Sequence, residues 1–333
     1  NVLCQGAQYA DELQQALGDY LPDLVVTAVS EVATALVHSM PVPVYAYYGN
    51  PDQKSALTRI YSDVVLHKAW RKPGRWANLM KNIIGLIFFG PAHNKVVKSL
   101  AGMANVAQND TEFYRRKGVA NISYERNMLE VDPSFQWRPK RDATEQTEPL
   151  KIIGNAGLLS STGNTIALEV IASQILPELK KNLGEGNFEI HLFGGGEPLP
   201  FLKPLLDDPH IKLRGFVEDL DAELLSAPVF LIANGFHPLF RVGNSRILHG
   251  WALGACMVIF EGTSEAMPEI IDGENALLAR SIEEFTQQIV RAGKDTALRR
   301  QIGQNGYKTV TTLYNPEKIV SDLIKKFEKA TQL

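Results

Sequence analysis

A segment in the second half of the chain combines arginines, a helix start and a histidine. Asn244 or Ser245 can cap a helix whose first turn carries Arg246, so N–H donors and a guanidinium would face the same anion. His249 follows three residues later, on the same predicted helix face. The apolar residues after it indicate a mostly buried helix, and an arginine at the mouth of such a helix needs a partner. The segment therefore predicts an anion site, and the alternative is a capped helix with solvated arginines.

Two glycine-rich turns offer a second set of ligand contacts. The first, residues 154–165, precedes a predicted helix, so its glycines would let a ligand approach the backbone where the helix start suits a phosphate. The second, residues 193–198, puts three glycines at the carboxyl end of a predicted strand. The structural alternative for both is a tight turn, with Ser and Thr capping the helix after the first. A glycine-rich turn alone is a weak signal, so both interpretations stay open.

Residues 261–275 contain several carboxylates. We expect Ser264 to cap a short helix that Asp272 and Gly273 end. Two or three carboxylates near a ligand cleft could bind sugar hydroxyls, although each one singly is more often a solvated surface charge.

The first half of the chain carries a strongly basic stretch. Residues 59–98 contain eight Lys or Arg against Asp63 alone, although the net charge of the whole chain is −3. The stretch also contains Trp70, Trp76 and the apolar run 83–89. Basic residues beside aromatic and apolar ones suit the surface of an anionic membrane, and the alternative is a buried helix with a solvated basic edge. We expect no nucleic-acid partner, because no recognised binding motif accompanies the charge.

The elements that must position these residues alternate between short apolar strands and helices, as in parallel sheets covered by helices. Strands rich in Val, Ile and Leu with little alternation indicate that both faces of the sheet are covered. Apolar residues from Leu168 to Leu183 recur every three or four positions and predict one helix, and residues 30–38 predict another. The predicted strands are residues 24–26, 42–47, 104–107, 122–124, 150–154, 188–193, 211–213, 229–233 and 256–260.

Length and composition set the class of protein. A chain of 333 residues usually forms two domains, and 45% hydrophobic with 21% charged residues excludes collagenous, coiled-coil and disordered classes. The two cysteines, Cys4 and Cys256, are far apart and provide neither a disulfide framework nor a cysteine-based metal site, which fits a reducing compartment. The longest apolar run, residues 83–90, is too short for a span of about 20 residues, and residues 1–19 show no signal-peptide pattern. We expect a cytoplasmic α/β protein with two doubly wound, Rossmann-like domains facing a cleft.

By its motifs, the second half resembles the donor-binding domain of a nucleotide-sugar glycosyltransferase of the GT-B fold, in the retaining family 4 (glycosyltransferase group 1). The first half is a weaker match, carried by residues 107–110 and 118–127. Four features in the family's order carry the main resemblance: the turn after the strand at 150, residues 193–196, residues 213–217, and residues 246–254 leading to 268–275.

The polar, aperiodic composition around residues 136–147 and the resemblance together give the expected domain boundaries. Residues 1–134 would form an acceptor-side domain, 135–148 a polar linker, 149–312 the donor domain, and 313–333 a helix that returns toward the first domain. The chain begins in a helical pattern at 9–17 with no strand before it, so we expect the first domain to lack its opening unit.

The resemblance has clear departures. Two glutamates of the family, with seven residues between them, are replaced by Arg241 and His249, and its Lys-Gly pair by Thr162 and Gly163. A common arginine of the family is replaced by Leu158. The cations that stabilise a leaving diphosphate must therefore come from elsewhere, or the activity is lost.

The resemblance implies transfer with retention and without a metal, driven by stabilising the leaving diphosphate. Arg246, helped by Arg241, would hold the diphosphate, and His249 would contact a ribose or phosphate in place of a carboxylate. Gly215, Phe216 and Val217 would hold the base through backbone contacts, and Glu269 or a neighbour would hold the donor hydroxyls. The other donor-binding candidates are Gly157, Ser160, Ser161, Thr162, Gly163, Asn164, Gly194, Gly196, Gly243, Asn244 and Ser245. The acceptor-side candidates are Tyr48, His67, Trp70 and Arg71.

The expected partners follow from the same resemblance. The donor would be a UDP- or GDP-sugar, bound as a substrate with no cofactor, and the acceptor a glycan or lipid-linked saccharide of the cell envelope. The charge and apolar run of residues 59–98, independently of the resemblance, would add peripheral contact with the inner face of the membrane. Two alternatives stay open: a catalytically silent GT-B module that binds glycan or nucleotide, and a sugar-nucleotide epimerase of similar fold.

Overall fold

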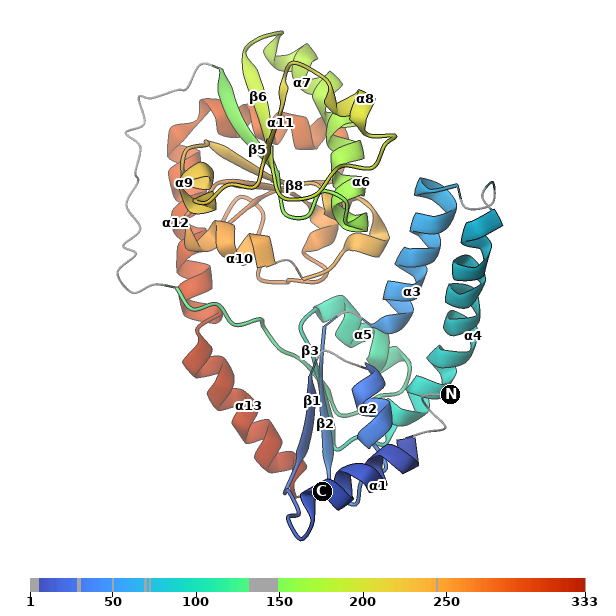
Figure 1. Cartoon of the computed structure of the whole chain (residues 1–333). Coiled ribbons are helices and arrows are strands. Elements are labelled where there is room, and N and C mark those ends of the chain that lie inside the picture. The colour runs from blue at the N-terminus through green and yellow to red at the C-terminus, as the bar shows by residue number, and fades with distance from the viewer. Residues whose placement is uncertain are drawn as a thin grey trace. The chain divides into compact units, whose positions relative to one another are not determined.

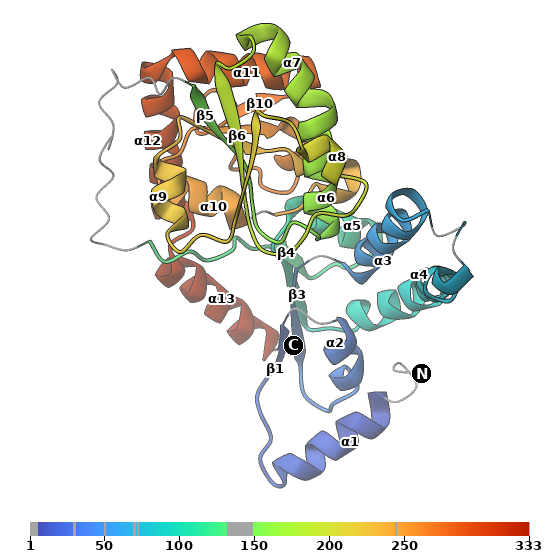
Figure 2. The ribbon, with the colours of Figure 1, turned by 45° about the horizontal axis from the view of Figure 1, so that its top comes forward.

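The chain divides into two compact units. The structure, a computed structural model, describes residues 6–28, 31–49, 51–68, 71, 73–131, 149–243 and 245–332. Unit 1 comprises Asn1–Asn127 and Pro316–Leu333, and unit 2 comprises Met128–Asn315. The predicted linker at 135–148 lies outside the described residues. Each unit is built on a parallel sheet, as Figures 1 and 2 show.

Unit 1 contains a four-stranded parallel sheet whose strands lie in chain order. The strands are β1 (Val25–Ala28), β2 (Val44–Tyr48), β3 (Gly102–Asn105) and β4 (Ile122–Tyr124). The helices are α1 (Gly6–Leu17), α2 (Glu31–Val37), α3 (Asp52–Tyr61), the π-helical turn η2 (Ser62–Leu66), the short η4 (Pro73–Arg75), α4 (Trp76–Lys98), α5 (Gln108–Arg116) and α13 (Pro316–Ala330).

The pleat of β2 divides the core of unit 1 into two layers. Val44, Ala46 and Tyr48 point to one face, where residues of α4 and α5 complete a buried cluster. Tyr45 points to the other face, where its ring meets Phe327 of α13 edge to face with centroids 4.9 Å apart. The residues of α13, far from β2 in sequence, are therefore part of the same folded unit.

Unit 2 contains a six-stranded parallel sheet in the order β10-β9-β8-β5-β6-β7. The strands are β5 (Leu150–Ala156), β6 (Phe188–Phe193), β7 (Ile211–Gly215), β8 (Val229–Ile232), β9 (Met257–Phe260) and β10 (Leu277–Ala279). This is the Rossmann order, in which the chain reverses direction across the sheet between its first and fourth strands, here β5 and β8. Ligands of such folds bind beyond the carboxyl ends of the strands at that point.

Helices cover both faces of the unit 2 sheet. The helical elements are α6 (Thr162–Val170), η5 (Ile171–Ile175), α7 (Leu176–Leu183), α8 (Lys203–Leu206), α9 (Leu220–Leu225), η6 (Asn234–Phe236), η7 (Pro238–Phe240), α10 (Ser245–Ala252), η8 (Glu261–Thr263), α11 (Ile282–Lys294) and α12 (Thr296–Leu313). On one face Trp251 of α10 and Val310 of α12 belong to a large buried cluster. On the other face Phe285 of α11 stacks on Phe260 of β9, with ring centroids 4.3 Å apart. Covered faces explain why these strands consist almost entirely of apolar residues.

The predicted strands agree with the sheets, and three local predictions are corrected. Each of the nine predicted strands overlaps an observed one, but the strand predicted at 104–107 ends at Asn105. Strand β10 was not predicted, because three apolar residues carry no periodic pattern and pair only at the sheet edge with β9. The predicted helix between 168 and 183 contains the π-helical segment η5.

The helix predicted from Ser264 to Asp272 is wrong. Ser264 instead follows the 3-10 turn η8 and donates its hydroxyl to the Glu261 carbonyl at 2.7 Å. Asn275 holds the chain beyond it as a loop, accepting from the Ile271 amide at 2.9 Å and donating to the Glu269 carbonyl at 2.8 Å. These side chain to backbone bonds replace the helical ones.

Candidate functional site

The glycine-rich turns of unit 2 meet at the carboxyl edge of its sheet. The Gly157 amide donates to the Phe193 carbonyl at 3.2 Å, and the Leu159 amide donates to the Gly195 carbonyl at 3.0 Å. The Gly194 amide donates to the Gly215 carbonyl at 2.8 Å. The turns after β5, β6 and β7 therefore form one connected backbone surface at the edge where a ligand is expected.

Position 194 must be a glycine for two reasons, the lack of space for a side chain and the backbone conformation. Its φ is +137°, and a Cβ there would lie 1.6 Å from the Gly157 carbonyl oxygen. Gly196 and Gly215 also have positive φ, but a Cβ on Gly215 would meet nothing within 4 Å. Two of the predicted donor-binding glycines, Gly157 and Gly194, are thus in direct contact with each other.

The start of α6 is organised by two side chains. Ser161 is the N-cap, and its hydroxyl accepts from the Asn164 amide at 3.4 Å. The Asn164 side chain donates to the Leu158 carbonyl at 2.8 Å and so ties the helix to the turn. Gly163 leaves room for Phe240, whose ring carbon would lie 3.3 Å from an added Cβ. Thr162 is the first residue of α6, and Ser160 lies near Gly196, so the predicted residues of this turn are gathered at one place.

Arg246 belongs to the same place. Its guanidinium donates to the Asn164 side-chain oxygen at 3.1 Å, although the two residues are 82 positions apart. Burial lowers the pKa of Arg246 to about 10, which leaves the guanidinium charged at neutral pH. A desolvated cation at the start of a helix is a strong anion-binding arrangement. The structure therefore brings together Arg246 and the turn that the sequence had predicted separately.

Arg241 and His249 have other partners. Arg241 forms an ion pair with Glu265 at 2.7 Å and lies against Gly262. His249 pairs with Asp221 at 2.6 Å, and more than a third of its side chain is exposed. Although His249 follows Arg246 by one helical turn, the two side chains contact different residues.

Glu269 is buried, with an internal partner. The Tyr314 hydroxyl donates to its carboxylate at 3.0 Å. Phe216, in contrast, is 82% exposed just after β7, and Val217 packs on the core. Gly243 and Ser245 flank the start of α10, whereas Asn244 lies outside the described residues.

The acceptor-side candidates are spread over unit 1. Tyr48 ends β2 and is buried, whereas His67 and Arg71 belong to the connection between η2 and η4. Trp70 lies outside the described residues. The structure does not bring Tyr48 together with the other two.

Beside Tyr48, unit 1 contains a buried polar cluster that the sequence did not predict. Tyr114 of α5 donates its hydroxyl to the Glu31 carboxylate, and His93 of α4 lies 3.6 Å from that carboxylate. Burial lowers the pKa of His93 to about 4 and raises that of Tyr114. Asp110, which precedes Tyr114 in α5, accepts a hydrogen bond from Lys54 at 2.8 Å. These residues are far apart in sequence and form no local motif, so only the fold identifies them as a group.

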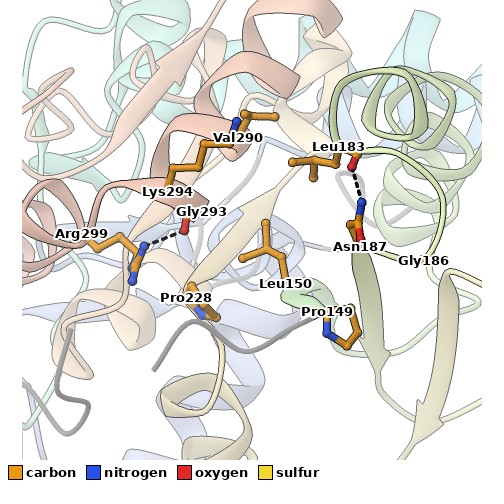
Figure 3. A pocket seen from close by; sticks show the side chains of 10 residues that line it. All are labelled: Pro149, Leu150, Leu183, Gly186, Asn187, Pro228, Val290, Gly293, Lys294 and Arg299. Carbon is orange, nitrogen blue, oxygen red and sulfur yellow. Dashed lines mark hydrogen bonds between the residues drawn. The ribbon is translucent and has the colours of Figure 1, made fainter. Parts of the chain in front are cut away.

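A cavity of about 460 Å³ lies at the opposite edge of the unit 2 sheet. Figure 3 shows Leu150, Asn187 and Pro228 at the starts of β5, β6 and β8, with Lys294 and Arg299 beside them. Arg299 donates to the Gly293 carbonyl at 3.0 Å and so caps the end of α11. The cavity contains none of the predicted donor-binding residues.

The gathered groups suit a phosphate-bearing ligand. The carboxyl edge of unit 2 offers backbone amides near glycines, a helix start and one partly buried cation. Within the described ranges, no three His, Cys, Asp or Glu side chains are arranged to hold a metal ion.

Comparisons with known proteins identify a family for part of the chain. Residues 151–295 match the family model described as glycosyl transferases group 1. The resemblance predicted from the motifs is thereby confirmed over this segment. No curated protein sequence matches the chain.

Solved structures of similar fold include TarM, sucrose-phosphate synthase from Thermosynechococcus elongatus, and Anabaena HepE in complex with UDP and glucose. TarM is 11% identical with a TM-score of 0.65, and the match covers 97% of this chain and 58% of TarM. The synthase is 14% identical with a TM-score of 0.67, covering 99% and 79%. HepE is 13% identical with a TM-score of 0.62, covering 96% and 80%. The chain thus spans less than two thirds of the length of TarM. The similarity of fold confirms the predicted fold class, two Rossmann-like α/β units as in GT-B proteins.

Proposed function

We propose that this protein is a retaining, metal-independent glycosyltransferase that moves a sugar from a nucleotide sugar to a cell-envelope glycan or lipid-linked saccharide. The observation that carries the proposal is the hydrogen bond between Arg246 and Asn164, because it joins a charged group to the glycine-rich turn at the reversal point of the unit 2 sheet. The match of residues 151–295 to group 1 glycosyl transferases supports the same chemistry.

The chemical argument concerns the leaving group. Breaking the bond to the anomeric carbon puts negative charge on the diphosphate, and fixed donors aimed at that charge lower the barrier. Arg246 supplies a permanent positive charge, and the amides at the start of α6 supply oriented dipoles. Asn164 fixes the guanidinium relative to the helix start, because its side chain bonds the turn and the guanidinium at once.

Arg241 and His249 rank behind Arg246 as diphosphate ligands. Each already pairs with a carboxylate, Glu265 and Asp221 respectively, so binding a phosphate would require that pair to open. Arg241 lies in the loop before α10 and His249 in the helix itself, so both remain close in sequence to Arg246.

The rest of the donor would be held by neighbouring groups. Phe216 presents an exposed ring after the left-handed Gly215, a place where a base can lie against the chain. Glu269 would contact donor hydroxyls, with Tyr314 fixing the orientation of its carboxylate. Anabaena HepE has been solved with UDP and glucose, which supports a UDP-sugar as the first donor to test.

On the acceptor side, we propose that unit 1 works in the cytoplasm at the inner face of the membrane, where a lipid-linked saccharide would be presented. The basic charge of residues 59–98 supports this location. Tyr48, His67, Trp70 and Arg71 stay proposals for acceptor contacts.

The experiment is a transfer assay with UDP- and GDP-sugars and lipid-linked saccharide acceptors, with the product analysed by NMR. We expect a glycoside whose anomeric configuration equals that of the donor. An inverted product would contradict retention, and a free epimerised nucleotide sugar would identify an epimerase. Full activity with a chelator present is expected, and its loss would contradict metal independence.

A second candidate is a silent module that binds nucleotide or glycan without turnover. The contacts of Arg241 and His249 favour it, because these residues replace two glutamates of the family and each already contacts a carboxylate. Nucleotide binding without any turnover would favour this candidate over the transferase.

A further inference from the structure

The exposed side of α4 is apolar. Five large side chains lie on one side of this helix, spaced by three or four residues and 44–70% exposed. They are Trp76, Met80, Ile84, Ile87 and Phe88. The sequence had left open a buried helix with a basic edge, and these exposures exclude it. Exposed apolar groups gathered on one face mark a contact with another apolar phase.

The hairpin does not need this face for its own packing. The opposite side of α4 faces α3, where Leu79 is buried. Polar contacts also join α4 to its neighbours: the Gln53 amide of α3 donates to the Gly90 carbonyl at 3.4 Å, and the Asn82 amide donates to Asp63 of η2 at 3.4 Å. Figures 1 and 2 both show α3 and α4 side by side.

The far end of α4 is fixed to the sheet of unit 1. His93 is completely buried in the polar cluster with Glu31, and Val97 belongs to the core. The same helix is therefore anchored at its carboxyl end and exposed on one side over its first four turns. A rigid, exposed apolar face costs little conformational entropy when it binds a surface.

The charge around this face identifies the surface. Helix α4 contains no Asp or Glu, and its Lys81, Lys95 and Lys98 are exposed. Only Asp63 opposes the eight basic residues of 59–98. A second copy of the chain is a poor occupant, because a symmetric contact would place these like charges opposite one another. Within the described residues no helix is long and apolar enough to cross a bilayer.

We propose that α4 lies in the plane of an anionic bilayer surface, with Trp76, Ile84 and Phe88 in the acyl boundary and its lysines at the phosphate groups. Exposed aromatic and apolar side chains with cations and no carboxylates beside them bind such surfaces in this way. The inference deepens the proposed function by naming the surface that would present a lipid-linked acceptor. Vesicle binding requires no donor, so the two proposals fail separately.

The test is co-sedimentation of the full chain with vesicles of phosphatidylglycerol and phosphatidylcholine at low salt. We expect binding to the mixed vesicles, weak binding to pure phosphatidylcholine, and a steep loss at high salt because the Debye length falls. The variant with Ile84→Glu and Phe88→Glu should bind at least about tenfold more weakly, since two inserted apolar groups are lost. Both side chains are exposed, so the variant should fold normally.

The matched control is Ile324→Glu on α13, which changes an apolar side chain that is 49% exposed elsewhere on unit 1. It should bind vesicles like the unaltered chain. Equal binding by the α4 variant, or no binding to anionic vesicles by the unaltered chain, would overturn the proposal. Concentration-dependent dimers that the α4 variant abolishes would assign the face to a second copy and overturn it as well. UDP binding on the same samples, unchanged in every variant, separates this result from the donor site.

Discussion

The two units present different chemistry at the same edge of the same kind of sheet. At the carboxyl edge of unit 2, the connections are glycine turns with exposed backbone and one partly buried cation, Arg246. At the carboxyl edge of unit 1, side chains fill the space: Tyr48 and Asn105 end β2 and β3, and Asn105 bonds the Gly49 carbonyl at 2.6 Å. The parallel sheet alone therefore does not determine what is bound, and the connections that follow its strands do.

A second contrast concerns where the units are apolar. Unit 2 buries its apolar residues in a sheet covered on both faces, whereas unit 1 leaves an apolar side of the first four turns of α4 exposed. One unit is thus suited to a small charged ligand and the other to an extended surface. The predictions below test this division, from the largest expected effect to the smallest.

Gly194→Ala should disrupt the carboxyl edge of unit 2 most severely. The added Cβ would overlap the Gly157 carbonyl oxygen, so the two turns must separate. We expect a loss of about 4 kcal/mol in the free energy of unfolding and loss of nucleotide binding. Thermal unfolding and calorimetry would measure both.

Gly215→Ala is the matched control for this steric effect. Gly215 also has a positive φ, but its Cβ would meet open space, so the cost should be about 1 kcal/mol of backbone strain. Equal melting temperatures for the two variants would show that the turns are not in contact.

Arg246→Ala should abolish transfer without unfolding unit 2. Removal of one preorganised group at a developing charge costs about 100- to 1,000-fold in rate. Steady-state kinetics with a UDP-sugar would measure the loss, and circular dichroism would verify the fold. Arg241→Ala, which breaks the pair with Glu265, should have a much smaller effect. Full activity in Arg246→Ala would reverse the assignment.

Unit 1 should lose stability in acid through His93. Burial lowers its pKa to about 4, below the usual 6.5, so the folded state resists protonation. The contribution of neutral His93 to the free energy of unfolding is complete above about pH 6.5. It is lost as the pH falls toward 4, by about 3 kcal/mol in total. Denaturant unfolding across this range should show a shallower pH dependence for His93→Phe. Identical slopes would mean that Glu31 or another neighbour controls the acid sensitivity.

His249→Ala should have the smallest effect. Its pair with Asp221 is exposed on both sides, and such pairs contribute less than about 1 kcal/mol. We expect transfer rates within about fivefold of the unaltered chain, measured in the assay used for Arg246→Ala. A loss as large as that of Arg246→Ala would place His249 on the diphosphate after all.

Much of the difference between the two units could be predicted from the sequence, but the contacts between residues distant in sequence could not. The apolar strands and the two glycine turns of unit 2 gave its fold class, because covered parallel strands have a recognisable composition. Local patterns also identified Arg246 and Asn164 as candidates. They could not show that the two bond each other across 82 positions, because such a contact depends on the strand order.

Unit 1 was harder to predict for the same physical reason. Glu31, His93 and Tyr114 come from three helices and form no motif, so their cluster exists only after folding. The charge of 59–98 was evident in the sequence, but which side of α4 is exposed depends on how it packs on α3. The loop after Ser264 was predicted as a helix from its local capping signal. That prediction is wrong because the Asn275 contacts override the signal.

Calorimetric titration of the chain with UDP, GDP, ADP and CMP tests the central claim most directly. The account predicts saturable binding of a nucleoside diphosphate that discriminates between the bases, weakened at least about tenfold by Arg246→Ala because a charge-assisted contact is lost. Lys294→Ala, in the cavity at the opposite edge of the sheet, should leave that binding unchanged. Binding by none of the four nucleotides, or binding that depends on Lys294 and not on Arg246, would contradict a donor site at the carboxyl edge of unit 2.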